Sequence, residues 1–144
     1  MKDFPHRYVA STHVEGASGE VIVTAPGLPD LVTAPPKEFD GPGDRWSPET
    51  LLVAAICDCF VLGFKAIAAA SKLTWNSLAV DVAGSLDRIE RKTRFTEVSI
   101  SARLTVPAGQ ESRAPRILEK AEEVCLITNS LSATVHLDSN VEVA

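Results

Sequence analysis

The sequence predicts an α+β fold with the element order βββ-α-ββ-α-β. Two observations indicate this fold. Apolar residues alternate with polar ones along two long segments, 78–90 and 94–106, and this two-residue period is typical of a strand with one buried face. Two other segments have the length and spacing of helices: residues 47–72 are largely apolar, and residues 113–127 carry their apolar side chains on one face. Because strands and helices do not alternate regularly, a parallel βαβ sheet is not expected. We expect a single domain over residues 1–144.

Short strands separated by turns make up the first third of the chain. The segments 7–14, 20–24 and 28–33 contain the β-branched and apolar residues typical of strands. Gly16-Ala17-Ser18-Gly19 fits the turn between the first two. A loop rich in proline and glycine follows over residues 34–46.

The first helix has a well-marked start. Ser47 is a good N-cap, Pro48 suits the first helical position, and Glu49 lies in the first turn, where the helix dipole favours an anion. The helix is predicted to run to about Lys72. Gly63 lies in its middle among small residues, which indicates close packing against another helix.

Residues 51–70 have the length and apolar character of a membrane span. Asp58 and Lys65 argue against this reading, because each costs roughly 2.5–3.5 kcal/mol near the middle of a bilayer. We therefore expect no membrane contact and a helix buried on nearly all sides. A domain of this size rarely surrounds one helix so completely by itself.

The second half continues with an antiparallel strand pair, a helix and a last strand. Segments 78–90 and 94–106 each present one apolar and one polar face, as expected of paired antiparallel strands. The last strand is predicted over residues 133–143. The predicted helix 113–127 has an apolar face formed by Ile117, Leu118, Ala121, Val124 and Cys125.

Composition excludes several classes of function. The 144 residues include 14 basic and 19 acidic side chains, for a net charge of −5, without a basic block. Nucleic acid is therefore not an expected partner. Residues 1–10 lack the apolar core of a signal peptide. Three cysteines are too few for a secreted disulfide scaffold, so we expect a cytoplasmic location.

The cysteines are the residues most able to carry chemistry. Cys57 and Cys59 are two positions apart on one helix, so their side chains point about 200° apart and do not form one metal site or disulfide. We expect no metal and no cofactor. Cys59 and Cys125 lie on different helices and would approach each other if these pack. The alternative for each is a small apolar core residue.

Peroxide chemistry needs a thiolate, a cation to lower its pKa and a second thiol to resolve the sulfenic acid. An arginine held by a carboxylate would supply the cation. Glu49 is a candidate carboxylate, yet ten residues of straight helix separate it from Cys59 by about 15 Å. It can assist Cys59 if the helix breaks, if an arginine bridges the gap, or across a subunit interface. Its alternative role is to stabilise the first turn.

The segment Ser47-Pro48-Glu49-Thr50-Leu51-Leu52-Val53-Ala54-Ala55, followed by Cys59, resembles the helix motif of the OsmC/Ohr family, the osmotically inducible and organic hydroperoxide resistance proteins. The segment Cys125-Leu126-Ile127-Thr128-Asn129-Ser130-Leu131 resembles the second motif of that family. The spacing of the two motifs and the element order agree, so the resemblance covers essentially the whole chain.

This resemblance implies an intertwined homodimer with two long central helices covered by antiparallel sheets. It also implies a thiol peroxidase that reduces organic hydroperoxides in oxidative stress defence. Cys59 matches the peroxidatic cysteine, Cys125 the resolving cysteine, and Glu49 the carboxylate that orients an activating arginine. A hydroperoxide and an external dithiol reductant would be the small-molecule partners.

The sequence departs from the family at the activating arginine, since the turn of residues 16–19 contains none. Arg45, four residues before Glu49, is a candidate substitute by i,i+4 pairing, or else a solvated loop residue. Arg94 and Arg88 are other possible donors.

Cys57 is an additional departure from the family pattern. We expect it to be either a core residue or a competing disulfide partner. Asp58 and Lys65 share one helix face, and we expect them to contact strand residues or each other's neighbours.

Two functions remain open from the sequence. One is the two-cysteine peroxidase. The other is an OsmC-like protein without efficient peroxidase activity that binds a small apolar ligand at the dimer interface, which the missing turn arginine favours.

Overall fold

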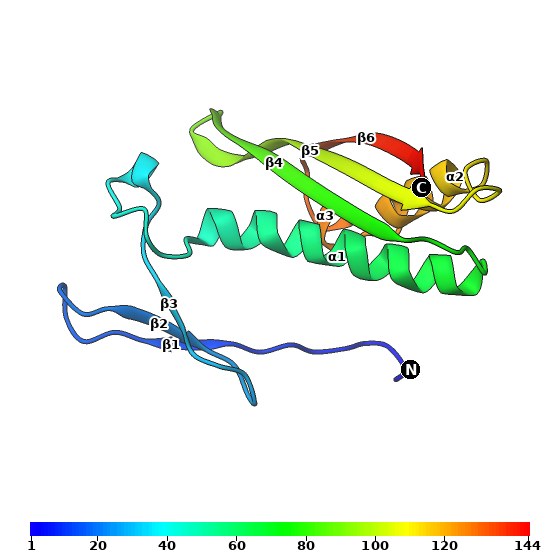
Figure 1. Ribbon diagram of the computed structural model, residues 1–144. Helices are drawn as coiled ribbons and strands as arrows, with labels where there is room; N and C mark the ends of the chain where they lie inside the picture. The colour runs from blue at the N-terminus through cyan, green and yellow to red at the C-terminus, as the bar shows by residue number, and fades with distance from the viewer. The chain divides into compact units, whose positions relative to one another are not determined.

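A computed structural model describes all residues from 1 to 144 and confirms the α+β class, with two three-stranded sheets and helices (Figure 1). The chain forms two compact units, residues 1–51 and residues 52–144. The single domain expected from the sequence stays a prediction.

The first unit contains a small antiparallel sheet in the order β1-β2-β3. Its strands are shorter than the sequence predicted, and none of their residues is fully buried: β1 is wholly exposed, and β2 and β3 are at most half-buried. A single turn of 3-10 helix, η1, follows in the loop. The elements are β1 (Ser11–His13), β2 (Val21–Thr24), β3 (Leu31–Thr33) and η1 (Lys37–Phe39).

Helix α1 (Pro48–Ala70) begins where the sequence predicted. The Ser47 hydroxyl accepts a hydrogen bond from the Thr50 amide at 3.1 Å, and the Thr50 hydroxyl accepts one from the Ser47 amide at 3.0 Å. This reciprocal pair is a capping box with threonine in the third position. The helix is unbroken to Ala70.

The expectation that α1 is buried on nearly all sides is wrong for a single chain. Its fully buried side chains form one stripe with a four-residue repeat, Ile56, Phe60, Phe64 and Ala68. The flank opposite this stripe is exposed because the second unit has one three-stranded sheet and two short helices, and these cover only one side of α1.

The second unit is built on the sheet β4-β5-β6. Strands β4 (Ser77–Ile89) and β5 (Lys92–Val106) form an antiparallel hairpin, closed by Glu90 and Arg91, both with positive φ. Strand β6 (Thr134–Val143) pairs with β5 in parallel, so the expectation of purely antiparallel sheets is wrong here. The helical segment between them carries the chain back to the starting end of β5, as a parallel pair requires.

The predicted helix 113–127 is interrupted. It consists of α2 (Ala114–Glu123) and a single turn, α3 (Leu126–Asn129). Cys125 lies between them in an extended conformation with φ −63° and ψ 103°. The Asn129 side-chain amide donates a hydrogen bond to the Glu123 carbonyl at 3.1 Å, so a carbonyl at the end of α2 has a partner without a further turn of helix.

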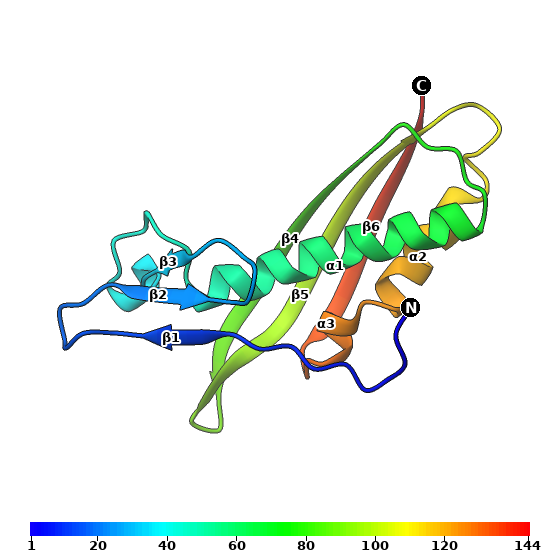
Figure 2. The ribbon, with the colours of Figure 1, turned by 90° about the horizontal axis from the view of Figure 1, so that it is seen from below.

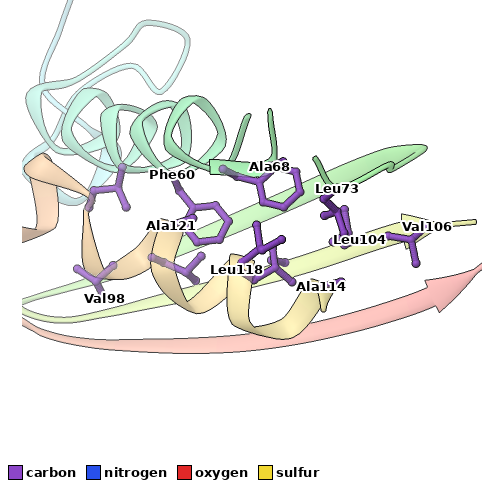
Figure 3. Packing of buried hydrophobic residues seen from close by; sticks show 14 residues of the cluster. Phe60, Ala68, Leu73, Val98, Leu104, Val106, Ala114, Leu118 and Ala121 are labelled. Atoms are coloured by element: carbon purple, nitrogen blue, oxygen red, sulfur yellow. The ribbon is translucent and has the colours of Figure 1, made fainter. Parts of the chain in front are cut away.

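The core of the second unit lies between its helices and one face of the sheet. Figures 1 and 2 show α1, α2 and α3 on the same side of β4-β5-β6. The alternation predicted for β5 is confirmed, since every second residue from Val98 to Val106 is buried. Figure 3 shows Phe60 and Ala68 of α1 together with Leu118 and Ala121 of α2 above this face.

Adding a methyl group is expected to have opposite effects on the free energy of unfolding at two glycines of this unit. At Gly63 a Cβ would lie 3.8 Å from the Ala121 carbonyl oxygen and from Val124, an ordinary contact. At Gly84 it would lie 2.9 Å from the Phe95 ring and 3.2 Å from Val53. We expect Gly63→Ala to raise the free energy of unfolding by roughly 0.5–1 kcal/mol through helix propensity. Gly84→Ala is expected to lower it by about 1–3 kcal/mol through overpacking.

Urea denaturation at one fixed protein concentration measures both changes. A destabilised Gly63→Ala would show that α1 and α2 lie closer together than described, and a neutral Gly84→Ala would show that Phe95 moves freely.

Candidate functional site

Cys59 and Cys125 are brought together in the second unit. The Cys59 thiol lies close enough to the Cys125 side chain and to the backbone of Ile127 and Leu126 for each of them to affect its pKa. Cys59 is carried by α1 and Cys125 by the break between α2 and α3. Both are free thiols. The approach of the two helical segments expected from the sequence is therefore present within one chain.

The interruption of the second helix is what places Cys125. Cys125 is 1% exposed, whereas its neighbour Val124 is 55% exposed. On a continuous helix the two would share the apolar face predicted from the sequence. The extended conformation of Cys125 turns its side chain inward and leaves Val124 at the surface. Its carbonyl also accepts a hydrogen bond from the buried Thr128 hydroxyl at 3.1 Å.

Cys59 lines an open, largely apolar groove of about 380 Å³. One wall is α1 and the other is the α2–α3 corner, where Leu126 is 64% exposed. A lone carboxylate, Asp58, adds a charge to the lining. The sequence pattern did not reveal this groove, because its outer wall depends on the break at Cys125. The lining residues are Ala55, Asp58, Cys59, Leu62, Gly63, Val124, Leu126 and Ile127.

The surroundings of Cys59 disfavour its thiolate. Burial raises the pKa of the Cys59 thiol, and the adjacent Cys125 raises it further. Backbone hydrogen bonds from Ile127 and Leu126 lower the pKa in part. No cation is among the groups that mainly shift the pKa of Cys59, so in a single chain this thiol is less acidic than an ordinary cysteine.

Cys57 faces away from this groove. It lies near the backbone of Val82 and near Asp81 on β4, and burial raises the pKa of its thiol. The predicted angular separation of Cys57 and Cys59 on the helix is confirmed, since their thiols meet different elements.

Glu49 lies in the first unit, where it lines a mostly apolar pocket of about 350 Å³ with Pro35, Pro36 and Phe39 among its walls. Its Oε2 atom is buried and has no hydrogen-bond partner. Since α1 is unbroken, Glu49 and Cys59 remain about 15 Å apart along the helix axis. A helix break therefore does not bring the two together.

The predicted pairing of Arg45 with Glu49 does not form. Arg45 precedes the helix, so the i,i+4 geometry does not apply, and its guanidinium lies 3.8 Å from Glu20 instead. Arg94 makes only long hydrogen bonds, to the Phe95 carbonyl at 3.4 Å and the Ser132 hydroxyl at 3.5 Å. Arg88 and Arg94 form no ion pair within 4 Å.

Asp58 and Lys65 are both exposed, and neither forms an ion pair within the chain. Both side chains lie on the flank of α1 that faces away from the sheet, so the expected contacts with strand residues do not form.

Comparisons with known proteins agree on one family. The family model for OsmC-like proteins matches residues 41–140. The uncharacterized protein YmaD of Bacillus subtilis is 29% identical over 114 residues, 75% of each chain. Peroxiredoxin OsmC of Escherichia coli is 26% identical over 92 residues, 64% of each chain.

Solved structures extend this agreement to the fold. An OsmC-like protein of unknown function from Vibrio cholerae has a TM-score of 0.84 and 18% identity, covering 94% of this chain and 100% of that chain. An organic hydroperoxide resistance protein OsmC from Legionella pneumophila has a TM-score of 0.72 and 26% identity, covering 98% of this chain and 100% of that chain.

The environment of Cys59 predicts a pH-dependent reactivity. A raised pKa keeps more of the thiol protonated at neutral pH, so alkylation by iodoacetamide should accelerate with pH through a midpoint above the ordinary value of about 8.5. Cys125→Ala removes a group that raises the pKa, so it should move the midpoint down. Peptide mass spectrometry follows alkylation at Cys59 itself.

The matched control is Cys57→Ser, which should leave the midpoint unchanged because Cys57 faces β4. A midpoint below the ordinary value would contradict the description and would show that a cation already acts on Cys59.

Proposed function

Because this chain belongs to the OsmC-like protein family, we propose that it is a thiol-dependent peroxidase that reduces organic hydroperoxides in oxidative stress defence. The observation that carries the proposal is the approach of the Cys59 thiol to Cys125 at the floor of an open apolar groove. Peroxiredoxin OsmC of E. coli and the organic hydroperoxide resistance protein of L. pneumophila are similar to this chain and support it.

The chemistry follows in three balanced steps. The Cys59 thiolate attacks the terminal oxygen of ROOH and the O–O bond breaks, so Cys59 becomes a sulfenic acid, while the alkoxide RO− leaves and takes up the proton that the thiol released, giving ROH. The Cys125 sulfur then attacks the Cys59 sulfur, so a disulfide forms and water leaves. An external dithiol reduces this disulfide by exchange and is itself oxidised to a disulfide.

The groove suits the substrate class. Its walls are mainly aliphatic side chains, so the organic substituent of a hydroperoxide loses contact with water on binding. The hydroperoxide oxygens would meet the sulfur at the groove floor. Hydrogen peroxide has no such substituent and would gain nothing from these walls.

Activation of Cys59 requires a positive charge that one chain does not place beside it. Glu49 is proposed to hold the activating guanidinium, since its buried Oε2 atom lacks a hydrogen-bond donor and an arginine would supply one. Arg45 is a weaker candidate than the sequence suggested, because it is paired with Glu20. Arg94 and Arg88 have no carboxylate partner within 4 Å and remain candidates.

We also propose a cytoplasmic homodimer. By length and composition alone α1 is apolar enough to cross a membrane. Because the family is one of soluble proteins, we expect the exposed apolar flank of α1 to be covered by protein and not by lipid. A second copy of the chain supplies that cover if the apolar flanks of two α1 helices pack together.

A second function has one observation in its favour. Burial and the nearby Cys125 raise the pKa of Cys59, which slows thiolate chemistry at neutral pH. In that case the groove would bind a small apolar ligand and the cysteines would be core residues. Steady-state hydroperoxide turnover separates the two functions, because a binding protein has none.

The peroxidase proposal predicts which thiols are needed. Consumption of cumene hydroperoxide with a dithiol reductant should fall at least 100-fold in Cys59→Ser, because Cys59 is the only one of the three free thiols that lines the groove. One equivalent of hydroperoxide added without reductant should produce a Cys59–Cys125 disulfide, detected by peptide mass spectrometry. In Cys125→Ser the sulfenic acid should persist and be trapped by dimedone.

Cys57→Ser is the matched control and should retain the wild-type rate, since Cys57 lies outside the groove. Equal rates for the wild type and Cys59→Ser would overturn the proposal. A disulfide that involves Cys57 instead of Cys125 would reassign the resolving role.

A further inference from the structure

Two residues at the end of α3, Thr128 and Asn129, hold the backbone around Cys125. The Thr128 hydroxyl donates a hydrogen bond to the Cys125 carbonyl at 3.1 Å, and the Asn129 backbone N–H donates to the same carbonyl at 3.0 Å. The Asn129 side-chain amide donates to the Glu123 carbonyl at 3.1 Å, which ties α3 to the last residue of α2. We call Thr128 and Asn129 the Cys125 clamp, because their bonds fix the chain at that cysteine and just before it.

Thr128 is a polar residue in an apolar part of the chain. It is 4% exposed, and apart from the helix cap Ser47 it is the one buried polar side chain. A buried hydroxyl destabilises a protein unless it has a hydrogen-bond partner, and the Thr128 hydroxyl has the Cys125 carbonyl as that partner. Valine has the same shape as threonine and would fill this space without a polar group. Filling the core therefore does not require a hydroxyl here, whereas holding the Cys125 backbone does.

The backbone at Cys125 determines where its sulfur lies. Cys125 is 1% exposed and extended, with φ −63° and ψ 103°, and a single rotation about its Cα–Cβ bond places the sulfur. A disulfide requires an S–S distance of about 2.0 Å with the two Cβ atoms about 3.5–4.5 Å apart. A reacting group that is misplaced by about 1 Å reacts on the order of 100-fold more slowly. The rate at which Cys125 reacts with Cys59 therefore depends on how firmly this backbone is held.

We propose that Thr128 and Asn129 are positioning residues for the resolving step, in which they hold the Cys125 sulfur where it attacks the sulfenic acid of Cys59. The inference rests on the proposed function and adds two residues to its second step. Neither residue lines the Cys59 groove, so the first attack on the hydroperoxide does not involve them. The Cys125 clamp thus acts on one step of the cycle and leaves the other unchanged.

The speed of the resolving step decides the fate of the sulfenic acid. When the Cys125 sulfur attacks, the S–S bond forms, the S–O bond of Cys59 breaks, and the hydroxyl leaves as water. A second hydroperoxide competes for the same sulfur: its O–O bond breaks, Cys59 is oxidised to the sulfinic acid, and the hydroperoxide is reduced to the alcohol. Only this second reaction accelerates with hydroperoxide concentration. The Cys125 clamp therefore sets the concentration at which the protein is inactivated.

Two variants test the role by separating the two steps. In Asn129→Ala and Thr128→Val, loss of the Cys59 thiol to one equivalent of cumene hydroperoxide should stay within about 3-fold of the wild-type rate. Formation of the Cys59–Cys125 disulfide should slow about 10-fold or more, because the sulfur is no longer held in place. The hydroperoxide concentration that converts half of Cys59 to the sulfinic acid should fall by the same factor. Rapid quenching and peptide mass spectrometry measure all three.

Thr128→Ser keeps the hydroxyl and should restore the wild-type rate of disulfide formation. Ser130→Ala is the matched control, because the Ser130 hydroxyl donates to the Leu126 carbonyl at 2.7 Å within the same turn and meets neither Cys125 nor α2. It should form the disulfide at the wild-type rate. Equal disulfide formation in the wild type and both clamp variants would overturn the role. Slowing of both steps, or equal slowing in Ser130→Ala, would show a general loosening of α3 and would overturn it too.

A second measurement needs no hydroperoxide. Each variant is equilibrated with oxidised and reduced dithiothreitol, and the fraction of Cys59–Cys125 disulfide gives an equilibrium constant. Asn129→Ala and Thr128→Val should shift it about 10-fold or more toward the two free thiols, and Ser130→Ala should not. An unchanged constant in both clamp variants overturns the Cys125 clamp alone. A wild type that forms no sulfenic acid overturns the peroxidase, and the resolving role with it.

Discussion

A 23-residue apolar helix cannot remain uncovered in water, and the second unit is organised around covering α1. Four side chains at a four-residue repeat are buried against the sheet and α2. At roughly 1.5–3 kcal/mol for each large apolar side chain, Ile56, Phe60 and Phe64 account for much of the stability of this unit. The flank of α1 that remains exposed is the surface that the proposed second copy would cover.

The same packing creates the thiol site. The end of α2 packs beside Gly63 of α1, and the chain then turns at Cys125 before α3 begins. That turn buries Cys125 and brings it to Cys59, while Val124 and Leu126 remain at the surface as the outer wall of the groove. A continuous helix would bury Val124 and form no such wall.

Local patterns predicted the features that local interactions determine. The cap formed by Ser47 and the buried face of β5 from Val98 to Val106 follow from neighbouring residues, and both were predictable. The break before Cys125 was not, because it depends on a hydrogen bond from Asn129 back to Glu123. The parallel pairing of β6 with β5 and the ion pair between Arg45 and Glu20 each join residues far apart in the sequence. Neither interaction produces a periodic pattern in the sequence from which it could be predicted.

Each of the two units contains an ionisable side chain of the candidate site that lacks a partner. In residues 52–144, the Cys59 thiol is buried without a cation among the main causes that set its pKa. In residues 1–51, the Glu49 carboxylate has a buried oxygen without a donor. The raised pKa of Cys59 in a single chain is compatible with the proposed peroxidase, provided that a cation is placed beside the thiol when the site is complete.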